Sequence, residues 1–464
     1  MNKDLRTFLN FLQDNHPEYF VKVGKEVSPI LEIPVIQQKL AKENKYPVIY
    51  VEKVQMSKLP LMTNLFGSYE LLGLAIGVED KSQILKEYMR REANPITTKK
   101  VSKEQAPVKE VIWTGKEVDL GKLPIVHHAE KDSGKYIVIG CMVCRDPYSG
   151  TPNVGIYRHE VKGKDRLGCM INPHHHASYI YRRYQEMGRP MEVSIFIGHH
   201  PAVDIGASSQ GSLDTHNEFE TMGGLLGESL ELVACETNSL EVPAWAEIVI
   251  EGIIEPDSID TDGPFAEYTG YYGEQKKVSV IDIKAITMRK DAIYHDLDPA
   301  HREHTLACVL PFESHIYRRV YEMVPSILDV YMPPSGCCFY TVYMSMKKQV
   351  EGEGRFAGLT ALGTNANLKY VVVVDDDINI HDESEILWAI ATRFEADIDL
   401  TVIPYTLGAH LDPSSYGEER FRKGPMTTKL IFDATKKVIL PFAERIRPPE
   451  DIWKKINLSE YLRF

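Results

Sequence analysis

The spacing of apolar positions divides the chain into three regions. In the first region, Leu5, Phe8, Leu9 and Leu12 recur at the spacing of one helical face, which predicts a helix near the N-terminus. The run "YPVIYVEKV" indicates a strand and "SQILKEYMRREA" a second helix. This mixture predicts an N-terminal α/β domain over residues 1–110.

The second region is rich in β signals. "KYIVIGCMVCRDP", "TPNVGIYRHEVKG", "MEVSIFIG", "AWAEIVIEGIIEP" and "VSVIDIKAITM" are strand-like runs bounded by Gly, Pro and Asn. Helical patterns interrupt them at "HHHASYIYRRYQEMG" and "DTHNEFETMGGLLGESL". We expect antiparallel strands that close into a barrel over residues 111–305.

Helix and strand signals alternate in the third region. "PFESHIYRRVYEMVP" and "SEILWAIATRF" predict helices, and "LKYVVVVDDDI" predicts a buried strand. Such alternation favours a C-terminal α/β domain over residues 306–464, which ends in a helix at "PEDIWKKINLSEYL". The expected fold class is therefore α+β.

Composition and charge exclude several function classes. The 464 residues carry a net charge of −13 with no Lys/Arg-rich block, so we expect no nucleic-acid partner. No apolar run approaches the ~20 residues that span a membrane, and the first residues lack the apolar stretch of a signal peptide. We expect a cytoplasmic protein with no membrane partner. Cys141 and Cys144 form a CxxC with no second CxxC or CxxH in the chain, and we interpret them as buried strand residues.

The stretch "DTDGPFAEYTGYYG" concentrates carboxylates around a turn. Asp260 and Asp262 precede a Gly-Pro pair and Glu267 follows it. Proline fixes its own φ and glycine allows close backbone approach, so the turn holds two acids at a set separation. The stretch alone is compatible with an active site or with a solvated turn.

A second acidic stretch, "VVVVDDDINIHD", follows a predicted buried strand. Three acids there could hold a divalent metal, as in DxD-type transferases. Alternatively, the acids cap the strand and begin a turn. Because the chain has no Gly-rich phosphate loop beside them, we favour the structural interpretation.

Further polar residues gain meaning from their order along the chain. Asn153, His175 and Glu218 supply an amide, an imidazole and a carboxylate, a set suited to Mg²⁺ or Mn²⁺. Arg158, five residues beyond Asn153, should project from the opposite face of its strand. An arginine between two acids would make an acid–base triad.

In that order, these residues resemble the UbiD-type decarboxylases, a family that depends on prenylated FMN. The resemblance covers nearly the whole chain through "NVGIYR", "THNEFE", "ETNSLEVPAWAEIVIEG", "DGPFAEYTGYYG", "VDDDINIHD" and "TTKLIFDAT". "NVGIYRHEVKGKDRLG" is similar to the (hydroxy)aryl acid decarboxylases. The resemblance implies a central split β-barrel of flavin-reductase type, a C-terminal oligomerisation domain, and homodimers or homohexamers.

The resemblance also implies roles. Asn153, His175 and Glu218 would ligate Mn²⁺ or Mg²⁺, which binds the cofactor's phosphate with K⁺ or Na⁺ nearby. Arg158 would orient the substrate carboxylate and Glu267 would protonate the product carbon. Asp262 completes this network where the family often has the longer Glu. The positions implied to bind the cofactor are Asn153, Val154, Gly155, Ile156, Tyr157, Arg158, His174, His175, Ser208, Ser209, Glu218 and Lys429.

The implied activity is reversible non-oxidative decarboxylation of an aromatic or heteroaromatic acid, which releases CO₂. A flavin prenyltransferase would supply the cofactor. One alternative is that the protein is a physiological carboxylase of an aromatic compound. An alternative of a different class is a DxD-type metal-dependent transferase built on "VVVVDDDI".

The stretch "HDLDPAHREHTLACVLPFESHIYRR" should lie near the pocket rim by its family position. It carries His295, His301, Arg302 and His304. One interpretation is a solvated helix start in which Glu303 pairs with Arg302. The other is that one of the four groups meets a polar substituent of the substrate, distal to the leaving carboxylate.

Overall fold

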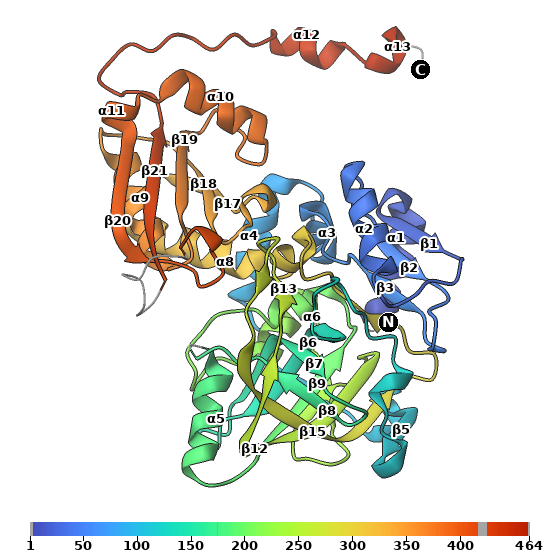
Figure 1. The fold of residues 1–464 in the computed structure, drawn as a ribbon. Helices are drawn as coiled ribbons and strands as arrows, with labels where there is room; N and C mark the ends of the chain where they lie inside the picture. Colours follow the sequence, from blue (N-terminus) through green and yellow to red (C-terminus); the bar gives the residue numbers. More distant parts are fainter. Residues whose placement is uncertain (1–2, 174, 416–424, 463–464) are drawn as a thin grey trace.

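The N-terminal region is built around a small sheet covered by helices (Figure 1). The computed structural model describes residues 3–173, 175–415 and 425–462. The sheet has the order β1 (Phe20–Val23), β2 (Val48–Val51), β3 (Leu61–Thr63) and β16 (Tyr294–His295). The helices are α1 (Leu5–Asn15), α2 (Glu32–Lys42), α3 (Tyr69–Ala75) and α4 (Lys81–Glu92). The fourth strand, β16, follows the last strand of the central region in the sequence, so the chain returns to complete this sheet.

The predicted first helix forms because its sequence supplies both a cap and an apolar face. The Asp4 side chain accepts a hydrogen bond from the backbone N–H of Thr7, which satisfies one unpaired donor at the start of α1. The four leucine and phenylalanine positions of the apolar pattern are all buried, as predicted.

The central region is a closed antiparallel barrel of six strands, as expected. Around the barrel the strands are β12 (Ile248–Asp262), β9 (Met191–Ile197), β6 (Tyr136–Arg145), β7 (Pro152–Val161), β8 (Arg166–Cys169) and β15 (Lys276–Met288). Pairing of β15 with β12 closes the ring, and β5 (Val111–Thr114) adds to the outer edge of β15. Helices α5 (His176–Glu186), α6 (Pro201–Gly206) and α7 (Glu218–Leu226) are inserted between strands.

Side chains alternate across β6, and this alternation separates the two cysteines of the CxxC. Cys141 packs in the core shared with the flanking domains, whereas Cys144 packs in a second core with other barrel residues. Both thiols are free and buried, and burial raises the pKa of each. Within the described ranges, no group of three or more His, Cys, Asp and Glu side chains is arranged to hold a metal. The cysteines are therefore structural strand residues, as interpreted from the sequence.

The C-terminal region is a mixed sheet with helices packed against it (Figure 1). The strand order is β17 (Ile327–Tyr331), β18 (Thr341–Met346), β19 (Tyr370–Asp375), β21 (Met426–Ala434) and β20 (Leu400–Leu407). The three central strands are parallel and the two edge strands antiparallel. The helices are α8 (Arg302–Met323), α9 (Glu353–Thr364), α10 (Glu383–Arg393) and α11 (Ala396–Asp399).

The acidic stretch at the end of β19 forms ion pairs with Arg393 of α10. Arg393 Nη1 lies 2.6 Å from Asp375 Oδ2 and 2.8 Å from Asp377 Oδ1, and its side chain is fully buried. The backbone N–H of Lys436 also donates to Asp375. These carboxylates are engaged in holding α10 and the chain after β21 against the sheet, which agrees with the structural interpretation.

The chain ends in an arm that extends away from the domains (Figure 1). The predicted terminal helix is two short helices, α12 (Glu450–Lys455) and α13 (Leu458–Tyr461). Several apolar side chains on the arm are exposed, including Ile446 at 97% and Trp453 at 71%. Among the helices of the described residues, none is long and apolar enough to cross a bilayer.

Candidate active site

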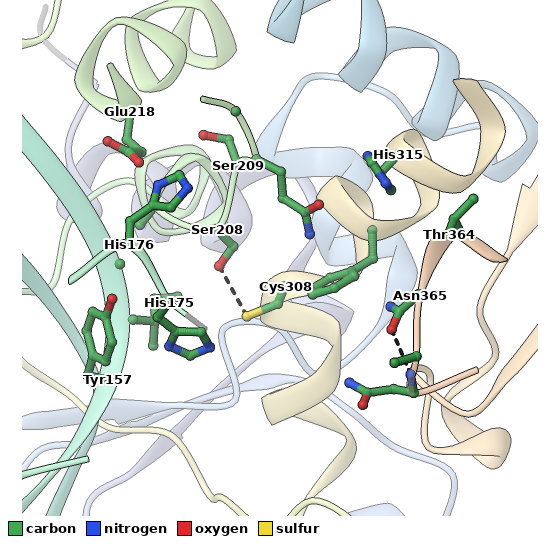
Figure 2. A pocket seen from close by; sticks show the side chains of 18 of the residues that line it. Tyr157, His175, His176, Ser208, Ser209, Glu218, Cys308, His315, Thr364 and Asn365 are labelled. Carbon is green, nitrogen blue, oxygen red and sulfur yellow. Dashed lines mark hydrogen bonds between the residues drawn. The ribbon is translucent and has the colours of Figure 1, made fainter. Parts of the chain in front are cut away.

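Two adjoining cavities lie between the barrel and the C-terminal region. The larger has a volume of about 830 Å³ and the smaller about 340 Å³. Figure 2 shows the larger cavity, with Tyr157, Ser208 and Glu218 on one side and Thr364 and Asn365 on the other. The two cavities share wall residues Ile156, Tyr157, His175, His304, Cys308, Phe312, Asn367 and His410.

The smaller cavity contains the predicted arginine between two acids. The Arg158 guanidinium donates from Nη2 to Asp262 and from Nη1 to Glu267. Its central carbon also lies 4.4 Å from the centre of the Phe265 ring. Arg158 and Glu267 line the cavity, whereas Asp262 is fully buried behind them. Burial raises the pKa of Asp262, and the ion pair with Arg158 opposes that shift.

The "DTDGPFAEYTGYYG" stretch positions these acids through a hairpin. β12 ends at Asp262, and a cis Gly263–Pro264 peptide leads into β13 (Phe265–Ala266) and β14 (Tyr272–Gly273). Gly263 has φ +90°, a conformation that glycine adopts readily. A Cβ at position 273 would lie 2.8 Å from Glu267 Oε1, so a larger residue there would displace the Glu267 carboxylate.

The third acid of the stretch is placed elsewhere. Asp260 is half-buried on β12, and its Oδ1 accepts from the backbone N–H of Thr261. The turn therefore brings two acids to Arg158 rather than presenting three to solvent. The shorter Asp262 side chain reaches Arg158 despite lacking the extra methylene of a glutamate.

The predicted metal ligands meet at the larger cavity. Asn153 Nδ2 donates to Glu218 Oε1 at 2.9 Å, and the Val154 backbone N–H donates to Oε2 at 3.2 Å. Glu218 is only 3% exposed, and this burial raises its pKa to about 7. His175 lines the same cavity, with its ring edge-on to Tyr157. His174 lies outside the described residues.

The donor set of this cluster fits a divalent cation. In the described part of the chain, no lysine or arginine forms an ion pair with Glu218, so its charge is uncompensated. An amide oxygen, an imidazole and a carboxylate are ligands that hard divalent ions accept. Asn153 would be the third protein ligand, beside His175 and Glu218, which line the same cavity.

Ser208, Ser209 and Lys429, which were also predicted to bind the cofactor, lie at different distances from the larger cavity. Ser208 and Ser209 line the larger cavity (Figure 2), and the Ser208 hydroxyl donates to Cys308 Sγ at 3.2 Å. Lys429 on β21 is buried behind the wall, and its Nζ donates to the backbone oxygen of Ala366, which does line the cavity. Burial lowers the pKa of Lys429.

The interpretation of residues around 301–304 as a solvated helix start is wrong. Glu303 is fully buried and does not pair with Arg302; its Oε2 accepts from Gln37 Nε2 at 3.0 Å. Arg302 instead lies over the ring of Tyr46 at 4.2 Å. The reason is tertiary: α8 begins against the N-terminal region, which covers its first turn.

Only one of the four polar groups predicted near the rim lines either cavity in the described chain. His304 borders both cavities, and its Nδ1 donates to the Pro299 carbonyl oxygen at 2.9 Å. His295 is fully buried, with its ring 3.6 Å from Asp204. His301 caps α8 and contacts Gln37. The hypothesis of a polar substrate contact therefore narrows to His304 within this set.

Sequence reasoning missed several residues of the smaller cavity. They are Val138, Met170, Asn172, Phe265, Tyr268, Lys276, Phe312, Phe339, Ala409 and Leu411. Most of these are apolar or aromatic residues that read as core positions in the sequence. Lys276 carries one weak signal, because it follows the hairpin that positions Glu267.

Three family models match the chain, and together they span most of it. All three describe 3-octaprenyl-4-hydroxybenzoate carboxy-lyase: the UbiD N-terminal domain matches residues 16–92, the Rift-related domain 99–301, and the C-terminal domain 304–434. Anhydromevalonate phosphate decarboxylase of Methanosarcina mazei is 36% identical over 434 residues, which are 94% of this chain and 96% of the relative.

Solved structures give the same relationship. The UbiD-class enzyme HmfF from Pelotomaculum thermopropionicum in complex with FMN is 37% identical with a TM-score of 0.92, over 99% of this chain and 100% of that chain. An evolved dimeric form of HmfF in complex with prFMN is 36% identical with a TM-score of 0.88, over the same shares of each chain. A 3,4-dihydroxybenzoic acid decarboxylase from Enterobacter cloacae is 27% identical with a TM-score of 0.90, over 98% of this chain and 99% of that chain. This chain belongs to the UbiD family and is a UbiD-like carboxy-lyase.

Proposed function

We propose that this chain catalyses the non-oxidative decarboxylation of an aromatic or heteroaromatic acid with prenylated FMN bound in the larger cavity. The observation that carries the proposal is Arg158, held between Asp262 and Glu267 in a smaller cavity that shares wall residues with the larger one. HmfF, which binds FMN and prFMN, supports the choice of cofactor.

The larger cavity supplies the groups that a phosphorylated flavin needs. Its volume lies within the ~300–1,000 Å³ typical of ligand pockets. Asn153, His175 and Glu218 would hold Mn²⁺ or Mg²⁺ beside the phosphate, and Ser208 and Ser209 would offer hydroxyl groups to it. A K⁺ or Na⁺ ion nearby stays a prediction from the family resemblance. When bound, prenylated FMN supplies an electron sink for the bond that breaks.

The residues of the smaller cavity perform the remaining steps. Arg158 orients the substrate carboxylate, and Asp262 and Glu267 fix the guanidinium. The aromatic walls Phe265 and Phe312 keep water away, which favours loss of the charged carboxylate as neutral CO₂. The electron pair left on carbon then takes a proton from the Glu267 carboxyl group, which regains one from solvent.

The relatives support two substrate classes. The 3,4-dihydroxybenzoic acid decarboxylase favours an aromatic acid with a polar substituent distal to the carboxylate, for which His304 is a candidate partner. The anhydromevalonate phosphate decarboxylase is more similar to this chain and favours a second candidate, an unsaturated acid that bears a phosphate.

We also propose that the protein is a homo-oligomer, a dimer or a hexamer. The exposed apolar side chains of the C-terminal arm support this, as does the dimeric form of HmfF. Removal of residues 436–464 should lower the number of subunits per particle, obtained by dividing the mass measured in solution by the mass of the shortened chain. An unchanged number of subunits would contradict a role of the arm.

The proposed activity is tested on protein produced alongside a flavin prenyltransferase and kept anaerobic. A panel of aryl, heteroaryl and phosphorylated unsaturated acids is incubated with it, and substrate loss and CO₂ release are measured. Protein produced without the prenyltransferase is the matched control and should be inactive. If protein that contains the cofactor turns over no acid of the panel, the proposal fails. Exchange of labelled bicarbonate into the substrate measures the reverse reaction.

A further inference from the structure

Lys276 places a positive charge on the wall of the smaller cavity. It is the first residue of β15 and pairs in backbone register with Asp262, the last residue of β12. Met170 and Asn172, which follow β8, line the same cavity. The backbone N–H of Met170 donates to the backbone oxygen of Arg158 at 3.3 Å, so this part of the wall adjoins the arginine.

Lys276 differs from Arg158 in its ion pairs and side-chain hydrogen bonds. Both terminal nitrogens of Arg158 are engaged by carboxylates, and its face lies on Phe265. Across the three described segments of the chain, no ion pair or side-chain hydrogen bond engages the Lys276 ammonium. An ammonium group at the edge of a ligand cavity without an internal partner is available to a ligand.

The formal charges around the smaller cavity suggest what the Lys276 ammonium can bind. With Asp262 ionised and Glu267 holding the proton that it donates, Arg158, Asp262 and Glu267 sum to a formal charge of zero. This cluster therefore has no positive charge left to offset a second negative charge on the substrate. Lys276 adds one positive charge and offers a point charge for the second anion.

Other polar groups in the cavity suit a full negative charge less well. Burial lowers the pKa of His304, which keeps its imidazole neutral near pH 7. Asn172 carries a neutral amide. Hydrogen bonds in which one partner is ionised are about twice as strong as neutral ones, so an anionic substituent gains most from Lys276.

We propose that Lys276 is a specificity-determining residue that binds a second anionic group of the substrate, either a carboxylate or a phosphate. The inference rests on the proposed function and deepens it. Arg158 holds the carboxylate that leaves, and Lys276 holds the one that stays. The enzyme then selects acids with two anionic groups over acids with one.

The chain offers a matched control in the adjacent residue. Lys277 lies on the same strand, is exposed, and lines neither cavity. Because successive strand residues point to opposite faces, Lys277→Met removes the same charge from the other side of β15. A comparison of Lys276→Met with Lys277→Met therefore separates a contact in the cavity from a change in overall charge.

The experiment measures kcat/KM of the loaded enzyme and its two variants on pairs of acids. One pair is benzoate and benzene-1,4-dicarboxylate; the other is 2-pentenoate and a 2-pentenoate with a terminal phosphate. Lys276→Met should lower kcat/KM roughly tenfold to a hundredfold for the dianionic member, as expected when a site loses a group that binds one substituent, and less than about twofold for the other. The pair that responds identifies the anion. Lys276→Arg should retain most of the preference, and Lys277→Met all of it.

Calorimetric titration of the same holoenzymes with both dianions gives a readout that does not need turnover. Weaker binding in Lys276→Met, but not in Lys277→Met, would support the inference even if no tested acid reacts, which would count against the proposed function alone. An equal loss on both members of a pair would show that Lys276 serves the reacting carboxylate, and would overturn the inference. Equal effects of the two methionine variants, or none, would also overturn it.

Discussion

Asn153 and Arg158 lie on the same strand, β7, and each contacts buried acidic side chains in a different way. β7 pairs with β6 in regular register from Pro152 to Tyr157, and an irregularity follows between Tyr157 and His159, next to Arg158. Asn153 lines the larger cavity and Arg158 the smaller one. Arg158 donates hydrogen bonds to both Asp262 and Glu267 and supplies a positive charge beside them. Asn153 meets Glu218, which has only neutral donors around it in the described chain.

The difference indicates which cluster is complete within the protein. A buried carboxylate is costly unless it is paired, protonated or bound to a cation. The Arg158 cluster is paired internally and is therefore preformed. The Glu218 cluster has a carboxylate whose pKa is raised to about 7, so it holds a proton or awaits a cation from outside.

The largest effect should come from Glu267→Gln. The variant keeps the hydrogen-bonding shape but removes the proposed proton donor, and we expect kcat to fall roughly 10²- to 10⁴-fold, the usual contribution of general acid catalysis. Flavin content should not change, because Glu267 does not line the larger cavity. Stopped-flow or steady-state product assays and flavin absorbance measure the two quantities.

The control for this variant is Glu274→Gln, an exposed acid at the end of the same hairpin. It should retain wild-type kcat. Turnover by Glu267→Gln at a near wild-type rate would show that the preformed cluster supplies no proton.

Glu218→Gln should break the other half of the comparison. Without its carboxylate the cluster loses its charge for a cation, and we expect metal affinity to fall by at least roughly tenfold to a hundredfold, the range seen for losing a group that merely supports a ligand. Flavin occupancy should fall with it if the ion bridges to the phosphate. Elemental analysis and flavin absorbance of the purified variant measure both.

Glu220→Gln serves as the control, because Glu220 lies on the same helix and lines neither cavity. Full metal occupancy in Glu218→Gln would contradict the assignment of the cluster. Loss of flavin with metal retained would separate the two ligands.

The sequence predicts this site better than its surroundings, for a physical reason. Asn153, Arg158 and Glu267 lie in stretches whose local conformation is dictated by strand alternation or by Gly and Pro, so their placement follows from short-range rules. The barrel, the helices of the N-terminal region and the structural role of the acidic residues at the end of β19 were predictable on the same grounds. The roles given to these residues stay predictions from the family resemblance.

The predictions failed where long-range packing decides. The start of α8 reads as solvated because it carries His301, Arg302 and Glu303, yet the N-terminal region buries it. Lys276 was missed as a cavity residue, because its one local signal is that it follows the hairpin of Glu267. The wrong interpretation of the helix start and the missed lysine both concern contacts between segments far apart in sequence.

Asp262→Asn should have a smaller effect than either carboxylate variant above. It leaves Arg158 bound by Glu267 alone, so the guanidinium should be less well oriented, and we expect kcat/KM to fall about tenfold, or ~1.4 kcal/mol. Asp262→Glu keeps the charge and should lose less than Asp262→Asn. Asp260→Asn, on the same strand but not in contact with Arg158, is the control and should be neutral. A wild-type rate in Asp262→Asn would show that one acid suffices to hold the arginine.

The last prediction concerns stability rather than activity, at a buried acid that keeps its proton. Burial raises the pKa of Glu303 from 4.5 to about 8, opposed by the hydrogen bond from Gln37. Between these values the folded protein keeps Glu303 protonated while the unfolded chain ionises it. Its contribution to stability is therefore full below pH 4.5 and is lost as the pH rises through about 8, by up to ~1.4 kcal/mol for each pH unit.

Glu303→Gln mimics the protonated side chain at every pH. Its thermal midpoint relative to wild type should therefore rise steadily from pH 6 to pH 8 and change little above that, since Asp296 and Asp298 nearby are present in both proteins. Scanning fluorimetry at fixed heating rate measures the difference. Glu322→Gln, at an exposed position of the same helix, should give an offset that does not depend on pH. A pH-independent offset for Glu303→Gln as well would mean that Glu303 is ionised in the folded protein. An ionised Glu303 would need a positively charged partner. Burial would then no longer distinguish Glu218 as the carboxylate that binds a cation.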